Sequence, residues 1–377
     1  MNTTERFKTA LKGGKPDRIP VAPKIWVDFA AKATNTPIED VIQNPLTALR
    51  VIALAGKKLD VDAVRQFHFP ARKLLHQDGR LYEINHKDEK IGTIDIDGGL
   101  STLLFDSKRF NICDPITIAY HHWAVSEPVV NNIEDAKAIA VPDAKLFDYL
   151  GWNKNQQTVI DEFGENFAFI GDCDSATMSY YIRFRGLERA MFDLIENPEL
   201  VHAVMEKGAQ TAIASGKYWL DMGIEILRLN DSAGNMTLMS PVHWQEFIYP
   251  HIKAVCDELH RYNKNAIIYC HICGNILPIA QNLVDAGFDC IAPLDPLGGF
   301  TVADIRAKVG QNVSLMGGVN TISLLQNNPN QIEHEATECI KQSGGNGFVL
   351  GSGCVVPRDC PIENIAALVN ASKKYKL

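Results

Sequence analysis

The sequence lacks the features that mark membrane, secreted and nucleic-acid-binding proteins. No apolar run approaches the roughly 18 residues that a membrane-spanning helix needs. Residues 1–18, MNTTERFKTALKGGKPDR, are polar and contain no apolar signal segment. Lys and Arg form no basic stripe, and the net charge of −8 disfavours binding to a phosphate backbone. We therefore expect a cytoplasmic protein that binds neither membranes nor nucleic acid.

Cysteine usage also excludes a disulfide-stabilised fold. The nine cysteines are odd in number and scattered along the chain. In a protein without a secretory signal, cysteines with a role more often bind metal or take part in catalysis. The 377 residues are 46% hydrophobic and 22% charged, which is typical of a globular protein with a sizeable core.

Short apolar runs alternate with helical patterns along most of the chain. The runs that we interpret as strands are residues 18–23, 61–67, 167–171, 225–229, 266–270, 290–294, 313–317 and 348–352. Amphipathic segments of helical length, among them 241–263, 275–287 and 328–344, separate the later runs. Strands that are apolar throughout and alternate with helices indicate a parallel sheet covered on both faces. The pattern predicts an α/β fold of the (β/α)8 TIM-barrel class.

Residues 72–147 interrupt this alternation. Within them, residues 79–105 indicate hairpin strands with polar turns, and residues 127–143 form a connector that leads into a short helix. No linker rich in Pro, Gly or Ser flanks the region. We expect one domain over residues 1–377, with 72–147 as an elaborated barrel loop.

Barrel enzymes carry their chemistry at the carboxyl ends of the strands. The polar residues that follow the predicted strands are Asp172 and Cys173, Asp231 and Ser232, His271 and Cys273, Asp295, Asn320 and Cys354. In an extended backbone His271 and Cys273 face one side, while Cys270 and Ile272 face the other. An imidazole and a thiolate that converge in this way form two thirds of a zinc site.

The third ligand has two candidates. Cys354 follows the last apolar run directly, through two glycines, whereas Cys360 lies further on in a loop. We favour Cys354, because the ends of all barrel strands open on the same rim. Three protein ligands with an open fourth position describe a catalytic zinc, since structural sites close themselves with a fourth ligand.

Other interpretations of these residues compete with the zinc site. A buried histidine can be an ordinary hydrogen-bonding group, and cysteines are common in barrel interiors. Asp172, Asp231 and Asp295 can act in catalysis, complete a metal site, or merely bond loop amides and cap helices. The arginines of the segment YYIRFRGLERAM, at positions 183, 185 and 189, suit a solvated or salt-bridged helix face.

Three stretches resemble the uroporphyrinogen decarboxylase superfamily. They are the opening ERFKTALKGGKPDRIPVAP at 5–23, the connector at 127–144 and GSGCVVPRDCPIENIAAL at 351–368. HICGN together with the later GSGC is similar to the His-x-Cys…Cys zinc motif of the corrinoid-dependent methyltransferases, including the methylcobamide:coenzyme M methyltransferases. The resemblance implies that His271, Cys273 and Cys354 bind zinc.

Two alternative functions, a decarboxylase and a non-catalytic binding module, fit the sequence less well than a corrinoid-dependent methyltransferase. The decarboxylases carry an Arg-x-Ala-Gly-Arg segment after the first strand, but residues 24–35, KIWVDFAAKATN, contain no arginine. A non-catalytic corrinoid- or zinc-binding module would need its own Asp-x-His-x-x-Gly corrinoid signature, and none occurs. A corrinoid would therefore come on a separate partner protein.

The resemblance implies a zinc-dependent methyltransferase that moves a methyl group between a corrinoid protein and a small molecule. That molecule is either a thiol acceptor of the coenzyme M type or a methyl donor to cobalt(I). His271, Cys273 and Cys354 would act in catalysis through zinc, with Asp172 and Asp231 as further catalytic candidates. A corrin ring is too wide for a packed barrel interior, so we expect it at an open carboxyl-end rim.

Overall fold

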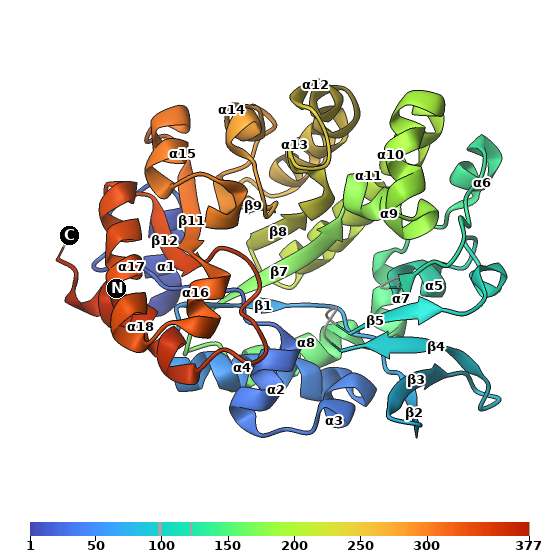
Figure 1. Ribbon diagram of the computed structural model, residues 1–377, viewed down its shortest axis with the longest axis horizontal. Helices are drawn as coiled ribbons and strands as arrows, with labels where there is room; N and C mark the ends of the chain where they lie inside the picture. The colour runs from blue at the N-terminus through green and yellow to red at the C-terminus, as the bar shows by residue number, and fades with distance from the viewer. Residues whose placement is uncertain (97–99, 121–122, 377) are drawn as a thin grey trace.

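The computed structural model describes residues 1–96, 100–120 and 123–376 (Figure 1). Within these residues the main sheet has seven parallel strands, in the order β1 (Ala63–Gln66), β7 (Ala168–Ser175), β8 (Ile226–Asn230), β9 (Ile267–His271), β10 (Cys290–Leu294), β11 (Ser314–Val319) and β12 (Phe348–Ser352). Figure 1 shows this sheet curled, with helices around its outside. These strands match seven of the eight predicted runs, with ends that differ by a few residues, so the TIM-type α/β fold is confirmed.

The eighth predicted strand, residues 18–23, does not form as a regular strand. Val21 makes an isolated parallel bridge with Leu350 of β12, and its carbonyl accepts the N–H of Asp62, just before β1, at 2.7 Å. Pro20 and Pro23 cannot donate backbone hydrogen bonds, which prevents a continuous ladder on either side. The segment thus links β12 to the start of β1 through a few separate hydrogen bonds.

The helices of the α/β part lie before, between and after these strands in the sequence. They are α1 (Thr3–Leu11), α2 (Val27–Thr34), α3 (Ile38–Gln43), α4 (Pro45–Leu59), α8 (Trp152–Phe163), α9 (Met178–Arg185), α10 (Leu187–Glu196), α11 (Pro198–Asp221), α12 (Pro241–His243), α13 (Tyr249–Tyr262), α14 (Ala280–Asp285), α15 (Val302–Val309), α16 (Thr321–Gln326), α17 (Pro329–Ser343) and α18 (Ile362–Lys374). Helix α17 starts where the sequence predicts, because Asn328 and Gln331 form a capping box, and it ends at Gly344 in the left-handed region. In the described part of the chain no helix combines the length and apolar character of a membrane span.

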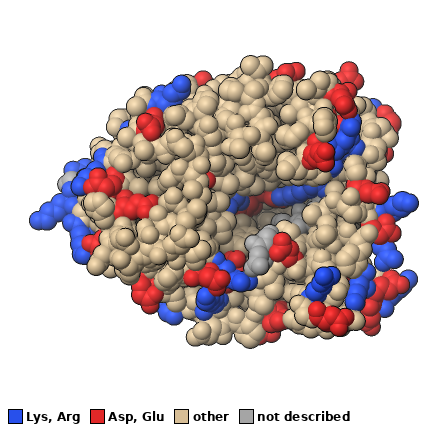
Figure 2. Space-filling view, viewed as in Figure 1, with Lys and Arg blue, Asp and Glu red and all other residues tan. Residues whose placement is uncertain are grey.

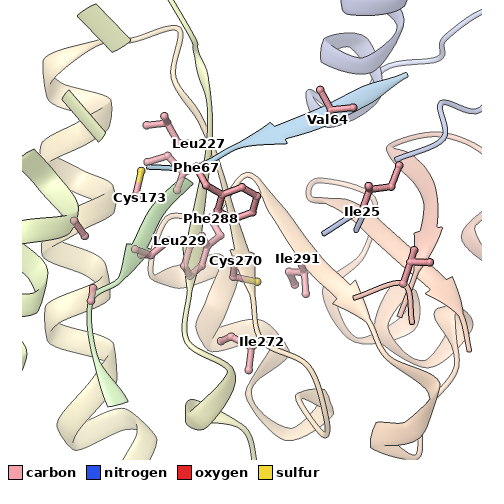
Figure 3. Close-up of a cluster of buried hydrophobic side chains, with 14 of the residues drawn as sticks. Ile25, Val64, Phe67, Cys173, Leu227, Leu229, Cys270, Ile272, Phe288 and Ile291 are labelled. Atoms are coloured by element: carbon pink, nitrogen blue, oxygen red, sulfur yellow. The ribbon is translucent and has the colours of Figure 1, made fainter. Parts of the chain in front are cut away.

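Buried side chains pack on both faces of the main sheet. Between strands and helices they form a continuous apolar layer, part of which Figure 3 shows, including Leu227, Cys270 and Ile272. On the opposite, inner face a second cluster joins Phe7 of α1 to residues such as Tyr269 of β9. Because strand residues alternate between faces, this division sets which polar side chains point into the interior.

The region 72–147 contains a second sheet. Its strands are β2 (Lys73–Gln77), β3 (Arg80–Ile84), β4 (Lys90–Asp95), β5 (Ser101–Leu104) and β6 (Trp123–Ala124), and its helices are α5 (Pro115–Ala119), α6 (Ile133–Ala138) and α7 (Ala144–Tyr149). Strands β2 to β5 pair antiparallel, which confirms the predicted hairpins, while β5 and β6 run parallel. The tight turn between β2 and β3 uses Asp78 and Gly79, both with positive φ. Residues 97–99 and 121–122 of the predicted insertion lie outside the described residues, and its status as a loop of a single domain stays a prediction.

Candidate metal centre

Three side chains from distant parts of the sequence converge at the carboxyl ends of β9 and β12. His271 is the last residue of β9, Cys273 follows two residues later, and Cys354 lies two residues beyond β12. One ligand atom from each, the imidazole nitrogen and the two sulfurs, lie within 4.8 Å of one another. His271 is buried and both cysteines are partly buried. The structure therefore brings together the three predicted ligands.

Strand alternation explains why His271 faces this cluster. Tyr269, two residues earlier, belongs to the inner cluster, whereas Cys270 and Ile272 belong to the outer apolar layer (Figure 3). After Cys273 the chain turns at Gly274, which has a φ of 86°. Its N–H donates to the Asp295 carboxylate at 2.9 Å, and this bond anchors the turn. Asp295 thus bonds loop amides here, as one of the competing interpretations anticipated.

Cys360, the alternative ligand, lies away from the cluster. Its thiol donates to the carbonyl of Leu324 at 3.1 Å, and its side chain is buried in the apolar layer. The structure therefore agrees with the choice of Cys354 over Cys360 as the neighbour of His271 and Cys273.

The chemistry of the three groups fits a zinc ion. Burial and the nearby Lys24 hold the pKa of His271 well below its ordinary value, so the imidazole is neutral and able to bind metal. Its Nδ1 is buried and has no hydrogen-bond partner among the described residues. The neighbouring Cys273 lowers the pKa of Cys354 to about 6, and the neighbouring Cys354 raises the pKa of Cys273. One imidazole and two cysteine sulfurs form a ligand set that zinc prefers.

Lys24 is a close neighbour that the sequence did not reveal. Its Nζ lies 2.7 Å from His271 Nε2, and the side chain is buried. Burial, together with the nearby guanidiniums of Arg228 and Arg65, holds the pKa of Lys24 well below its ordinary value. Because Lys24 contacts Nε2, it leaves Nδ1 as the nitrogen without a protein partner in the described structure.

A layer of buried polar side chains lies near the cluster on the inner face. Arg65 Nε donates to the Tyr269 hydroxyl at 2.8 Å. Arg228 makes an ion pair with Asp172 and donates to Asn230 Oδ1 at 2.6 Å. Both arginines occupy strand positions two residues after apolar members of the inner cluster, which explains their inward direction.

The two predicted catalytic aspartates occupy different surroundings. Asp172 pairs with Arg228 and lines the cavity described below. Asp231 is buried, and its carboxylate accepts the Thr177 hydroxyl at 2.5 Å and the Ser179 N–H at 2.6 Å, at the start of α9. Burial raises the pKa of Asp231. Its observed bonds hold the first turn of α9, and a catalytic role for either aspartate stays a prediction.

The other polar residues at the strand ends take structural positions. Cys173 is buried in the outer layer (Figure 3), and Asn320 caps α16 by accepting the Ile322 N–H at 2.8 Å. Ser232 is the exception, because its Oγ accepts the Cys273 thiol at 3.3 Å. Ser232 therefore contacts one of the three ligands.

The arginines at 183, 185 and 189 form the salt bridges that the sequence anticipated. Arg183 pairs with Asp174, while Arg185 and Arg189 both pair with the buried Asp193, at 2.7 and 3.1 Å. Only Arg189 is substantially exposed. These residues brace α9 and α10 and lie outside the candidate ligand set.

A cavity of about 510 Å³ adjoins the cluster. Its lining includes Lys24, which contacts His271, and Ser232, which contacts Cys273. Val355, the residue after Cys354, also lines the cavity. Figure 2 shows a hollow in the middle of one face, with acidic and basic atoms inside it. A small molecule in this cavity would thus lie beside the three candidate ligands.

Sequence reasoning missed Lys24, Arg65 and Arg228. A usable signal existed for the two arginines, because each interrupts a short apolar strand at a position that alternation assigns to the inner face. Buried arginines in such strands indicate a polar layer inside the sheet. No comparable signal identified Lys24, which lies in an irregular segment.

Comparison with known proteins identifies the family. The uroporphyrinogen decarboxylase (URO-D) family profile matches residues 116–375. A methylated-thiol–coenzyme M methyltransferase of Methanosarcina mazei is 27% identical over 179 residues, which cover 47% of this chain and 46% of that protein. A methylcobamide:CoM methyltransferase of Methanosarcina barkeri is 25% identical over 182 residues, covering 48% and 51%. The uroporphyrinogen decarboxylase of Coxiella burnetii is 27% identical over 191 residues, covering 50% and 51%.

The fold agrees with these similarities. A solved structure described as a methyltransferase from Methanosarcina mazei superposes with a TM-score of 0.72 at 18% identity, and the match covers 99% of both chains. In sequence, the chain spans about half the length of the curated relatives that it matches. The resemblance found in the sequence is confirmed, and the chain belongs to the uroporphyrinogen decarboxylase (URO-D) family.

Proposed function

We propose that this protein is a zinc-dependent methyltransferase that moves a methyl group between a corrinoid protein and a small molecule. The observation that carries the proposal is the convergence of His271, Cys273 and Cys354 within 4.8 Å, beside a cavity. The similarity to proteins named as methyltransferases of coenzyme M and methylcobamide supports the same conclusion.

The three ligands determine what the site can do chemically. Zinc held by His271, Cys273 and Cys354 would favour the thiolate form of a thiol, or polarise the heteroatom that carries a methyl group. The protein's own contribution is to position the ligands: Lys24 contacts the His271 imidazole, and Ser232 accepts the Cys273 thiol. Transfer in either direction uses the same residues.

The corrinoid belongs to a separate protein in this proposal. The chain carries no Asp-x-His-x-x-Gly signature, and a packed barrel interior cannot admit a corrin ring. The partner would therefore present its corrinoid at the open face above the cavity, where a methyl group can approach the metal centre.

The test combines metal content with methyl transfer. The purified protein is assayed for zinc and then mixed with methylated corrinoid protein and candidate thiols, or with cobalt(I) corrinoid protein and candidate methyl donors. We expect bound zinc and a change in the methyl–cobalt absorbance with at least one partner molecule. Zinc-loaded protein that supports transfer in neither direction would favour a non-catalytic binding module.

A decarboxylase activity is the second candidate, because curated uroporphyrinogen decarboxylases also match at similar identity. The buried arginines Arg65 and Arg228 could be taken as carboxylate-binding groups. Arg228 is already paired with Asp172, and Arg65 Nε donates to the Tyr269 hydroxyl. These pairings support the methyltransferase over the decarboxylase.

A further inference from the structure

The cavity beside the metal centre is lined by both polar and ring side chains. Lys24 and Ser232, which contact His271 and Cys273, line the side next to the three ligands. The rest of the lining includes charged side chains (Asp28, Arg72, Asp172, Asp174 and Arg228), apolar side chains and six ring side chains. The six rings are those of Trp26, Phe67, His68, Phe69, Phe147 and Trp152. A molecule bound along the cavity would place its polar atom at the metal centre and its apolar part against these rings.

One group of rings lies at the start of α2 and the end of β1. The centroids of Trp26 and Phe67 are 4.3 Å apart with nearly perpendicular planes. Phe69 lies 5.6 Å from each of them. Edge-to-face pairs of this kind fix one another's orientation, so the group forms a preformed aromatic surface.

The second group is a stack of nearly parallel rings. His68 lies between Trp152, at 3.8 Å and 10°, and Trp219, at 4.4 Å and 11°. Phe147 continues the stack at 4.8 Å from Trp152. His68 separates Phe67 and Phe69 in the sequence, so a single four-residue segment, FHFP, contributes to both groups.

We propose that the small-molecule substrate is aromatic: an aryl methyl ether or aryl methyl thioether, or the phenol or aryl thiol that remains after demethylation. This inference rests on the proposed methyltransferase function and names its substrate class. A cavity of about 510 Å³ falls in the range that encloses ring-sized ligands. A ring gains stacking contacts with these aromatic side chains that a two-carbon thiol cannot make.

The group transfer balances with these substrates. In the donor direction, the bond between the methyl carbon and the ring-bound oxygen or sulfur breaks, and its electron pair stays on that heteroatom. The cobalt(I) corrinoid supplies the pair for the new carbon–cobalt bond. The released phenolate or aryl thiolate takes a proton from solvent.

Direct binding is the first test, because it does not depend on catalysis. Calorimetry on the zinc-loaded protein would compare methoxybenzene with methanol, and methylthiobenzene with dimethyl sulfide, each pair sharing the methylated atom. We expect each aromatic compound to bind at least tenfold more tightly than its aliphatic partner. Equal affinities within both pairs would overturn the proposal. Free cobalamin that binds in the same cavity more tightly than the aromatic compounds and excludes them would also overturn it.

Two substitutions locate the binding site. Phe69→Ala removes one ring of the wall, and Ala119→Trp introduces a bulky side chain at a cavity-lining residue. We expect each to weaken binding of methoxybenzene about tenfold and to leave zinc content unchanged. Ala138→Trp is the matched control, because Ala138 is also the last residue of a short helix but is exposed and outside the cavity lining. Unchanged binding in both cavity variants would overturn the assignment.

Methyl transfer with the same four compounds separates this inference from the function on which it rests. Transfer from the aliphatic donors alone would refute the aromatic class but support the methyltransferase. Tight aromatic binding without transfer from any donor would support the cavity assignment but count against the methyltransferase.

Discussion

At the scale of single residues, the site depends on which cysteine and which nitrogen face the cluster. Cys354 and Cys360 are six positions apart and chemically identical, yet only Cys354 lies with His271 and Cys273. Lys24 contacts Nε2 of His271 and so helps to orient the imidazole. Each of these points can be tested with a matched pair of variants.

The first residue-scale prediction concerns zinc content. We expect about one zinc per chain in the purified protein, as for a site with three protein ligands. Cys354→Ala should lose most of this zinc, because a thiolate ligand is removed. Cys360→Ala should keep it, because the Cys360 thiol bonds the Leu324 carbonyl instead. Elemental analysis after dialysis measures both, and a Cys354→Ala protein with full zinc would refute the ligand set.

The second concerns Lys24. Lys24→Met should weaken metal binding by about 10- to 100-fold, the usual cost of losing a group that orients a metal-binding histidine. The absorption spectrum of the Co²⁺-substituted protein should also change, since the imidazole would lose its contact at Nε2. Lys32→Met serves as the control, because Lys32 is exposed and pairs with Asp359 at the surface. Identical Co²⁺ affinities in the two variants would show that Lys24 does not position His271.

At the scale of elements, hydrogen bonds between helices and strand ends hold the strands that present the ligands. His260 of α13 contacts the carboxylate of Asp289, just before β10, at 2.9 Å. The same carboxylate accepts the N–H of Ile268 in β9 at 2.7 Å. Asp289 therefore joins a helix and two strands near the base of the strand that ends in His271.

This link predicts a pH dependence of stability. The hydrogen bond with Asp289 raises the pKa of His260. A raised folded-state pKa means that the stabilisation is fully present below the unfolded value of about 6.5 and is lost as the pH rises through the folded value. The urea midpoint should therefore fall from pH 6 to pH 8 by more in the wild type than in His260→Gln. Parallel pH profiles for the two proteins would show that the pair contributes nothing measurable.

At the scale of the whole molecule, the curled parallel sheet gathers the ends of β1, β7 and β8 around one cavity, beside the candidate ligands at the ends of β9 and β12. The region 72–147 contributes part of the cavity wall, including Arg72, Leu100 and Ala119. The site is thus assembled from the main sheet and the antiparallel sheet together.

The whole-molecule prediction concerns the decarboxylase alternative. Incubation with uroporphyrinogen should yield no coproporphyrinogen, because residues 24–35 supply no arginine and Arg228 is already paired with Asp172. Fluorescence of the oxidised porphyrins, separated by chromatography, measures the product. Turnover above that of a heat-inactivated sample would contradict this expectation.

The sequence by itself determined the seven regular strands, the hairpins and the His271–Cys273 pair, whereas Cys354 was favoured over Cys360 from its expected place on the rim. The strands, hairpins and pair depend on local patterns: apolar runs flanked by helix caps, polar turns, and a His-x-Cys pair at a strand end. Such signals lie within a few residues of one another, so they can be seen without the fold. The irregular form of residues 18–23 was missed, because Pro20 and Pro23 limit the ladder without changing the apolar pattern.

Only the tertiary structure decided which polar groups surround the ligands. Lys24, next to the irregular segment 18–23, contacts the imidazole of His271, which lies 247 positions away in the sequence. Asp231 was a catalytic candidate by its place after a strand, yet its carboxylate bonds the start of α9. The aromatic cavity joins α2, β1, α7 and α8. These contacts depend on how the strands curl and on where loops return, and that is a property of packing over the whole chain which no short stretch of sequence encodes.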